Sequence, residues 1–144
     1  MAIAAGTLGI RLLPQEVRGL EDFDRAFAAM AKERPDALLL LPTALSPTHG
    51  IRLVDLALKR RLPAIVQGRE VVAAGALMSY SANWTDIAHR AATFVDKILK
   101  GAEPADLPVE QPTKFELLIN MKTARALGLT IPRQMLTRAD EIIE

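Results

Sequence analysis

The chain has 144 residues, of which half are apolar and 24% are charged, and its formal net charge is +1. This composition is typical of one globular domain and excludes a disordered chain or a strongly basic nucleic-acid-binding protein. The absence of cysteine excludes disulfides, thiol catalysis and cysteine-ligated metals.

The first half predicts alternating strands and helices. Residues 11–17 can form a short strand, which Pro14 weakens because proline lacks a backbone N–H. The apolar run 36–42 predicts a strand buried on both faces. Of the two helices expected in this half, the first is predicted from four apolar residues at helical spacing: Phe23, Ala26, Phe27 and Met30. The second is expected over 51–58.

The middle of the chain repeats the pattern. Residues 62–66 and 75–80 are expected to be strands. Asn83 followed by Asp86 has the form of a capping box, which predicts the start of an amphipathic helix. Gly101 is expected to end that helix, because glycine readily adopts the left-handed conformation of a helix terminus.

The last third begins with an extended, proline-rich segment over 102–112 and continues with a strand over 115–119. Asn120 is expected to cap a short helix that ends at Gly128. Strands thus alternate with helices, which predicts a single α/β domain over 1–144, with a three-layer and mostly parallel sheet.

No catalytic or metal-binding pattern is found. His49 and His89 have no partner at metal-ligand spacing, and both are expected to face solvent. The nucleophile elbow, the P-loop and the dinucleotide fingerprint are missing. We therefore expect neither an enzyme nor a bound cofactor.

Ligands of open parallel sheets bind beyond the carboxyl ends of the strands. A guanidinium there can hold a carboxylate, a tyrosine ring can stack on a flat group, and amide or hydroxyl groups can orient a polar ligand. An alternative stays open, in which Tyr80 packs on a helix and Arg69 and Glu70 form an exposed ion pair. The candidate ligand-binding residues are Thr43, Gln67, Arg69, Glu70, Ser79 and Tyr80.

Three ordered stretches carry a resemblance to a known family: ALMSYSAN at 76–83, RAATFVDKILKG at 90–101 and EPADLPVEQPTKFELLIN at 103–120. They closely resemble the C-terminal half of ABC-transporter substrate-binding proteins related to the tryptophan/tyrosine-type binding proteins. The chain has Val66-Gln67-Gly68-Arg69-Glu70 where family members often have Tyr-Gly-Phe-Arg-Glu. An aromatic ligand is therefore not inferred from the resemblance.

The resemblance implies a type I periplasmic-binding-protein fold, in which two α/β lobes close on a small molecule. The chain would be the second lobe, and the 83–101 helix would pack on a missing first lobe or on a partner chain. The implied ligand is an amino acid or another carboxylate. The implied partners are an ABC permease and a second copy of the chain, in a homodimer that can exchange this helix.

The resemblance also implies a periplasmic location. The residues at the start of the chain lack the positive charge of a signal peptide, so the chain expressed as given is expected to stay in the cytoplasm. The alternative is a stand-alone cytosolic α/β module that binds a ligand or regulates a partner without catalysis.

Overall fold

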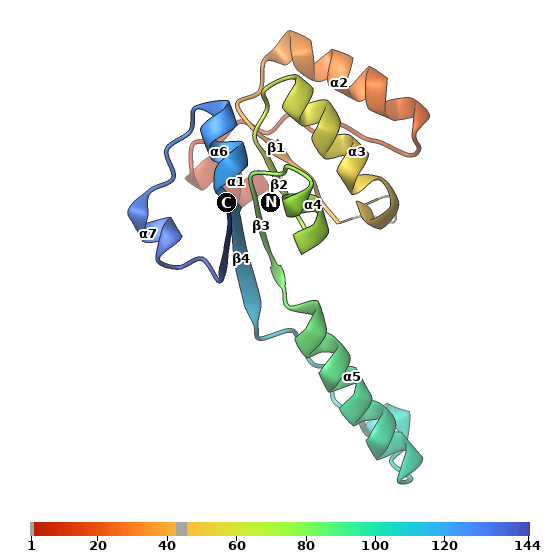
Figure 1. Ribbon diagram of the computed structural model, residues 1–144. Helices are drawn as coiled ribbons and strands as arrows, with labels where there is room; N and C mark the ends of the chain where they lie inside the picture. The colour runs from red at the N-terminus through yellow and green to blue at the C-terminus, as the bar shows by residue number, and fades with distance from the viewer. Residues whose placement is uncertain (1, 43–45) are drawn as a thin grey trace.

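The computed structural model describes residues 2–42 and 46–144, which form a mixed α/β fold (Figure 1). The helices are α1 (Ala2–Thr7), α2 (Glu21–Glu33), α3 (Ser46–Lys59), α4 (Arg69–Ala73), α5 (Trp84–Leu99), α6 (Met121–Leu127) and α7 (Arg133–Leu136), with a 3-10 turn, η1, over Pro104–Asp106. The strands are β1 (Leu38–Leu39), β2 (Ala64–Val66), β3 (Met78–Ala82), β4 (Phe115–Asn120) and β5 (Glu141–Ile143).

The five strands form one sheet in the order β1-β2-β3-β4-β5. Neighbouring strands are parallel except β3 and β4, which are antiparallel and pair from Met78↔Ile119 to Ala82↔Phe115. The expected mostly parallel sheet is therefore confirmed. The carboxyl ends of β1, β2 and β3 and the amino end of β4 lie at the same edge.

Helices cover both faces of the sheet. On one face, apolar side chains of α2, α3 and α4 pack together, and Phe23, Phe27 and Val54 are almost completely buried. On the other face, side chains of α6 and α7 and the loop between them pack around the fully buried Ile119. The sheet is thus the middle one of three layers, as expected.

Asn120 connects the sheet to two helices and is buried at the end of β4. Its Oδ1 accepts a hydrogen bond from the backbone N–H of Thr123 at 2.9 Å, which caps α6 as predicted. Its Nδ2 donates to the carbonyl oxygen of Val72 in α4 at 2.8 Å. One side chain therefore fixes α4 and α6 relative to β4.

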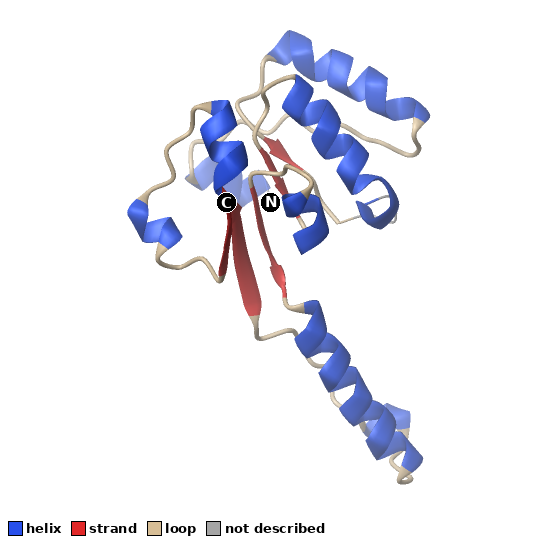
Figure 2. Cartoon of the chain, in the orientation of Figure 1, coloured by secondary structure: helices blue, strands red, loops and turns tan. Residues whose placement is uncertain are grey.

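The most conspicuous feature is α5, which extends away from the sheet (Figure 2). We call α5 together with residues 103–114, which run back along it, the arm. Lys114 pairs with Asp86 at 2.5 Å, and Arg90 pairs with Glu110, so ion pairs hold the two parts of the arm together. No residue of α5 is buried.

Several expectations about local structure are wrong. Residues 11–17 form no strand, in keeping with the missing N–H of Pro14. The strand expected over 36–42 is only β1, an edge strand, and Leu39 in it is 51% exposed rather than buried on both faces. His49 is half-buried and packs edge-on against Phe23, with 6.0 Å between ring centroids.

The buried cap Asn120 gives a test of this architecture. Asn120→Ala removes the cap of α6 and leaves the Val72 carbonyl without its partner, so we expect a loss of about 2 kcal/mol in the free energy of unfolding. Asn83→Ala is the matched control, because Asn83 also caps a helix and donates to one partner, Glu116, but it is only half-buried. Water can replace its lost hydrogen bonds, so this substitution should cost only about 1 kcal/mol. Urea unfolding measures both, and equal losses would contradict the central position of Asn120.

Asp22, in the first turn of α2, gives a test by pH. Its carboxylate accepts a hydrogen bond from the backbone N–H of Arg18 at 2.9 Å and pairs with Arg25 at 2.6 Å. These contacts, above all the one from Arg18, lower the pKa of Asp22. The stabilisation is therefore present above the pKa of the unfolded chain, about 4, and is lost as the pH falls through the lower folded value.

We expect Asp22→Asn to destabilise the chain more at pH 7 than at pH 3, because asparagine can accept the same hydrogen bond without the charge. Thermal unfolding across this range measures the difference. Asp24→Asn, which changes an exposed carboxylate in the same first turn, is the control. A difference between wild type and Asp22→Asn that does not change with pH would contradict the assignment.

Candidate functional site

The carboxyl end of β3 and the strands beside it form a polar surface on the face that carries α4. Cross-strand pairing places Val66, Ser79, Leu118 and Glu141 in one row across this face. Ser81 and Glu116 form the next pair toward the edge. We call the polar residues here the polar ledge, which consists of Arg69, Ser79, Ser81, Asn83, Glu116 and Glu141.

Arg69 begins α4, and its side chain reaches across the sheet to β5. Its Nε donates to Glu141 Oε2 at 2.9 Å, and its Nη2 donates to Glu141 Oε1 at 2.5 Å. The hydrogen bonds and the charge of Glu141 raise the pKa of Arg69. The predicted carboxylate-binding residue is thus present at the expected edge, with a carboxylate of the chain already on it.

The two residues predicted from β3 lie on opposite faces of the sheet. Ser79 is fully buried on the α4 face, where its Oγ lies 3.4 Å from Ser81 Oγ. Tyr80 is 62% exposed on the other face and stacks on Phe115 with 5.6 Å between ring centroids. Ser81 is buried on the same face as Ser79, so the accessible part of the polar ledge consists of Arg69, Asn83, Glu116 and Glu141. Tyr80 lies on the opposite face from them.

The remaining predicted site residues are Gln67, Glu70 and Thr43. Gln67 is half-buried in the turn between β2 and α4, and Glu70 is exposed in the first turn of α4. Thr43 lies outside the described residues. The structure therefore brings Gln67, Arg69 and Ser79 to one edge, places Glu70 beside them, and separates Tyr80 from them. Their role in ligand binding stays a prediction.

Sequence reasoning missed four of the six residues of the polar ledge. Asn83 was identified only as a helix cap, which it is, since its Oδ1 accepts from the Asp86 N–H at 2.7 Å. Its Nδ2 also donates to Glu116 Oε1. The period of two in a strand places Ser81 and Glu116 on the α4 face, and this signal was available. No sequence signal indicated Glu141, because the strand that contains it was not predicted.

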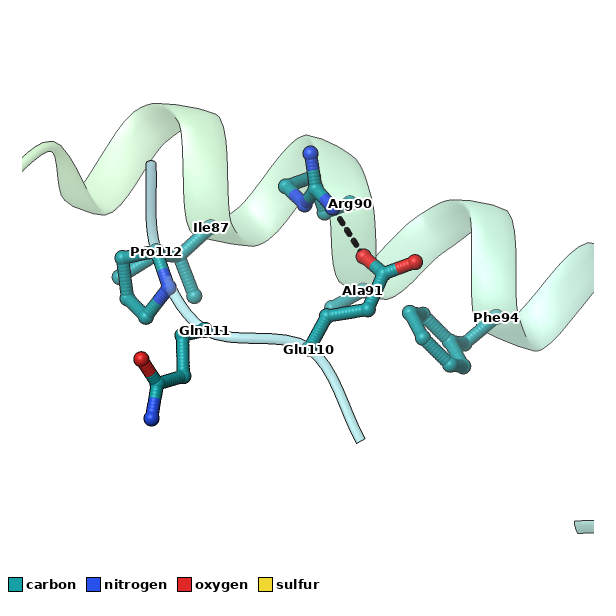
Figure 3. A pocket seen from close by; sticks show the side chains of 7 residues that line it. All are labelled: Ile87, Arg90, Ala91, Phe94, Glu110, Gln111 and Pro112. Atoms are coloured by element: carbon teal, nitrogen blue, oxygen red, sulfur yellow. Dashed lines mark hydrogen bonds and ion pairs between the residues drawn. The ribbon is translucent and has the colours of Figure 1, made fainter. Parts of the chain in front are cut away.

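The two described pockets lie elsewhere. One, of about 310 Å³, lies inside the arm, and the ion pair of Arg90 with Glu110 joins two of its lining residues (Figure 3). The other, of about 390 Å³, lies between the ends of α2 and α3 and is lined by Phe27, Arg34 and Arg60 among others. No residue of the polar ledge lines either of these pockets, and the Arg69 side chain in the ledge is two-thirds exposed.

Some kinds of site are missing from the part of the chain that the structure describes. Residues 2–42 and 46–144 contain no group of three or more histidine, aspartate or glutamate side chains arranged to hold a metal ion. Within the same ranges, no helix combines the length and the hydrophobicity that crossing a bilayer requires.

Comparison with known proteins gives a consistent result. The profile described as ABC transporter substrate binding protein matches residues 1–143. A search of curated proteins found no match. Among solved structures, a conserved domain protein from Vibrio cholerae O1 is 28% identical, with a TM-score of 0.88 over 98% of this chain and 47% of that one.

Two further structures share the fold. An ABC domain from Streptococcus pneumonia, solved in complex with L-Trp, is 24% identical, with a TM-score of 0.89 over 98% of this chain and 48% of that one. An open, ligand-free substrate-binding protein with adhesive properties from Clostridium difficile is 16% identical, with a TM-score of 0.65 over 99% of this chain and 47% of that one.

The chain therefore spans about half the length of the solved structures that it resembles. The expected fold, one lobe of a periplasmic-binding-protein-like architecture, is confirmed by these likenesses. The match to the profile covers nearly every residue, and the family that it describes binds substrates. The chain belongs to the ABC transporter substrate binding protein family.

Proposed function

We propose that the chain is one lobe of the solute-binding component of an ABC importer, and that its polar ledge forms one wall of the ligand cleft. The observation that carries this proposal is the convergence of Arg69, Ser81, Asn83 and Glu116 at the edge where β2 and β3 end and β4 begins. Open α/β sheets bind ligands at this kind of edge.

The ledge suits a small molecule with charged groups. Arg69 offers a guanidinium that is two-thirds exposed, and the half-buried Asn83 and Glu116 offer polar groups beside it. Glu116 uses one carboxylate oxygen for Asn83 and has no described partner for the other. An amino acid or a related carboxylate matches this set, because each of its polar groups finds a partner of complementary charge or hydrogen-bonding type.

The open form of the ledge supports a cleft shared with a second body. A closed site that excludes water from the ligand needs a second wall, and the described residues supply only one. In the complete transporter component, a first lobe would provide that wall, and the closed form would be the one that the permease recognises. The periplasm is the compartment that fits this role.

The arm supports the same arrangement. Its helix presents an apolar stripe that the return segment does not cover, formed by Trp84, Val95, Ile98 and Leu99. Leu99 is 81% exposed, and an uncovered stripe of this kind is typical of a surface that packs on another body. We propose that the first lobe covers this stripe and that, in the chain alone, a second copy covers it by exchange of the arm.

Arg69→Gln tests the ligand site. We expect the variant to bind its ligand at least about tenfold more weakly, because a charge-assisted, two-point contact with a carboxylate is lost. The probes are the twenty amino acids and a set of small mono- and dicarboxylates, screened by saturation-transfer NMR, which detects millimolar affinity. Arg133→Gln, an exposed arginine of α7, is the matched control.

Two outcomes would count against the proposal. The first is that wild type binds none of these probes at millimolar concentration. The second is that Arg69→Gln and Arg133→Gln bind the best probe equally well.

The apolar stripe predicts self-association. We expect the chain to sediment as a dimer at micromolar concentration and Val95→Lys to sediment as a monomer, because a charge on the stripe must be desolvated in the dimer. Thr93→Lys is the matched control, since Thr93 lies on the opposite side of α5, where its hydroxyl bonds to the His89 carbonyl. A monomeric wild type, or dimers of both variants, would contradict the proposed exchange.

A further inference from the structure

The pairing of Arg69 with Glu141 changes what the polar ledge can bind. Both contacting donors of the guanidinium, Nε and Nη2, are directed at the two oxygens of one carboxylate. The partners are 72 residues apart in sequence and belong to α4 and β5. An incoming ligand carboxylate therefore has to share this guanidinium with Glu141 or displace it.

A second carboxylate lies close to the first on the same face. Glu116 is two residues before Leu118 on β4, and Leu118 pairs with Glu141 on β5. Glu116 and Leu118 are thus about 7 Å apart along the strand, and Glu141 is the next residue across. Asn83 Nδ2 donates to Glu116 Oε1, which holds this carboxylate in place.

The ledge therefore carries two carboxylates and one guanidinium, with neutral hydroxyls beside them. Glu70, exposed at the start of α4, adds a further negative charge nearby. The carboxylate of the neighbouring Asp140 instead accepts a hydrogen bond from the backbone N–H of Leu117 at 2.8 Å. A ligand that brings only a negative charge would meet like charges on two sides of Arg69, which weakens its binding.

We propose that Glu141 is a specificity-determining residue: it makes the ledge select zwitterionic ligands, in which an ammonium group lies next to a carboxylate, over anions of the same shape. This inference rests on the proposed ligand site. The carboxylate of the ligand binds Arg69, and its ammonium group binds Glu141 and the open oxygen of Glu116. A plain carboxylate is rejected because Glu141 already occupies the guanidinium of Arg69. Such a ligand would displace Glu141 from Arg69 without offering Glu141 a cation in return.

The test compares pairs of ligands that differ only in the amino group. The probes are L-tryptophan with indole-3-propionate, and L-leucine with 4-methylpentanoate, titrated into the full chain by saturation-transfer NMR. For wild type we expect at least one amino acid to bind about tenfold or more tightly than its deaminated counterpart. For Glu141→Gln we expect this ratio to fall to within about threefold, with the deaminated acid binding more tightly than before.

Two variants separate specificity from a loss of structure. Glu141→Asp keeps the charge and should keep the preference for the amino acid, whereas a merely structural role of the side chain would not distinguish charge from shape in this way. Glu144→Gln, an exposed carboxylate of the same terminus, is the control and should behave as wild type. The amide spectrum of each variant shows whether β5 remains in the sheet.

The outcomes distinguish this inference from the proposed function. Equal binding of the amino acids and their deaminated counterparts by wild type, or an unchanged ratio in Glu141→Gln, would overturn the inference while leaving a carboxylate site at Arg69 in place. Absence of binding by all four probes and by the wider ligand panel would overturn the proposed function itself, and the inference with it.

Discussion

The antiparallel pairing of β3 with β4 is the constraint on which the rest of the structure depends. Because Ala82 pairs with Phe115, the chain leaves the sheet and returns to it at adjacent positions of one edge. Residues 83–114 must therefore lie outside the sheet, and most of them belong to the arm, which is held together by its own ion pairs and not by a buried core. The same crossing point borders the polar ledge, so the arm, which we propose packs on another body, and the ledge, which we propose holds a ligand, meet at one place.

The ledge is held in shape by interactions that cross between elements. Asn120 fixes α4 against β4 through the Val72 carbonyl, and α4 in turn carries Arg69 toward Glu141. Asn83 connects the start of α5 to Glu116 on β4. Movement of the arm relative to the sheet would thus be transmitted directly to a carboxylate of the ledge. A lobe closure that reorients α5 and a ligand that binds Glu116 would then favour one another.

Local signals predicted the parts of the fold that local physics determines. The caps at Asn83 and Asn120, and the glycines 101 and 128 with positive φ at helix ends, are where the sequence predicts them. The short elements α4 and β5 were not predicted, because α4 begins after Gly68 without a side-chain cap and β5 has only three residues. The site was therefore predicted less completely than the fold, since Arg69 lies in α4 and Glu141 lies in β5. Ser79 and Tyr80 were treated as one site although the alternation of a strand places them on opposite faces.

Amide chemical-shift mapping tests the central claim, that the ligand is held where these strands end, most directly. Titration of the isotope-labelled chain with the amino acid that binds best should shift the amides of residues 67–70, 79–83, 116 and 141, and leave the pocket of Phe27, Arg34 and Arg60 unchanged. Amide shifts that change only in that pocket or in the arm, with those of the polar ledge unchanged at saturating ligand, would contradict the account.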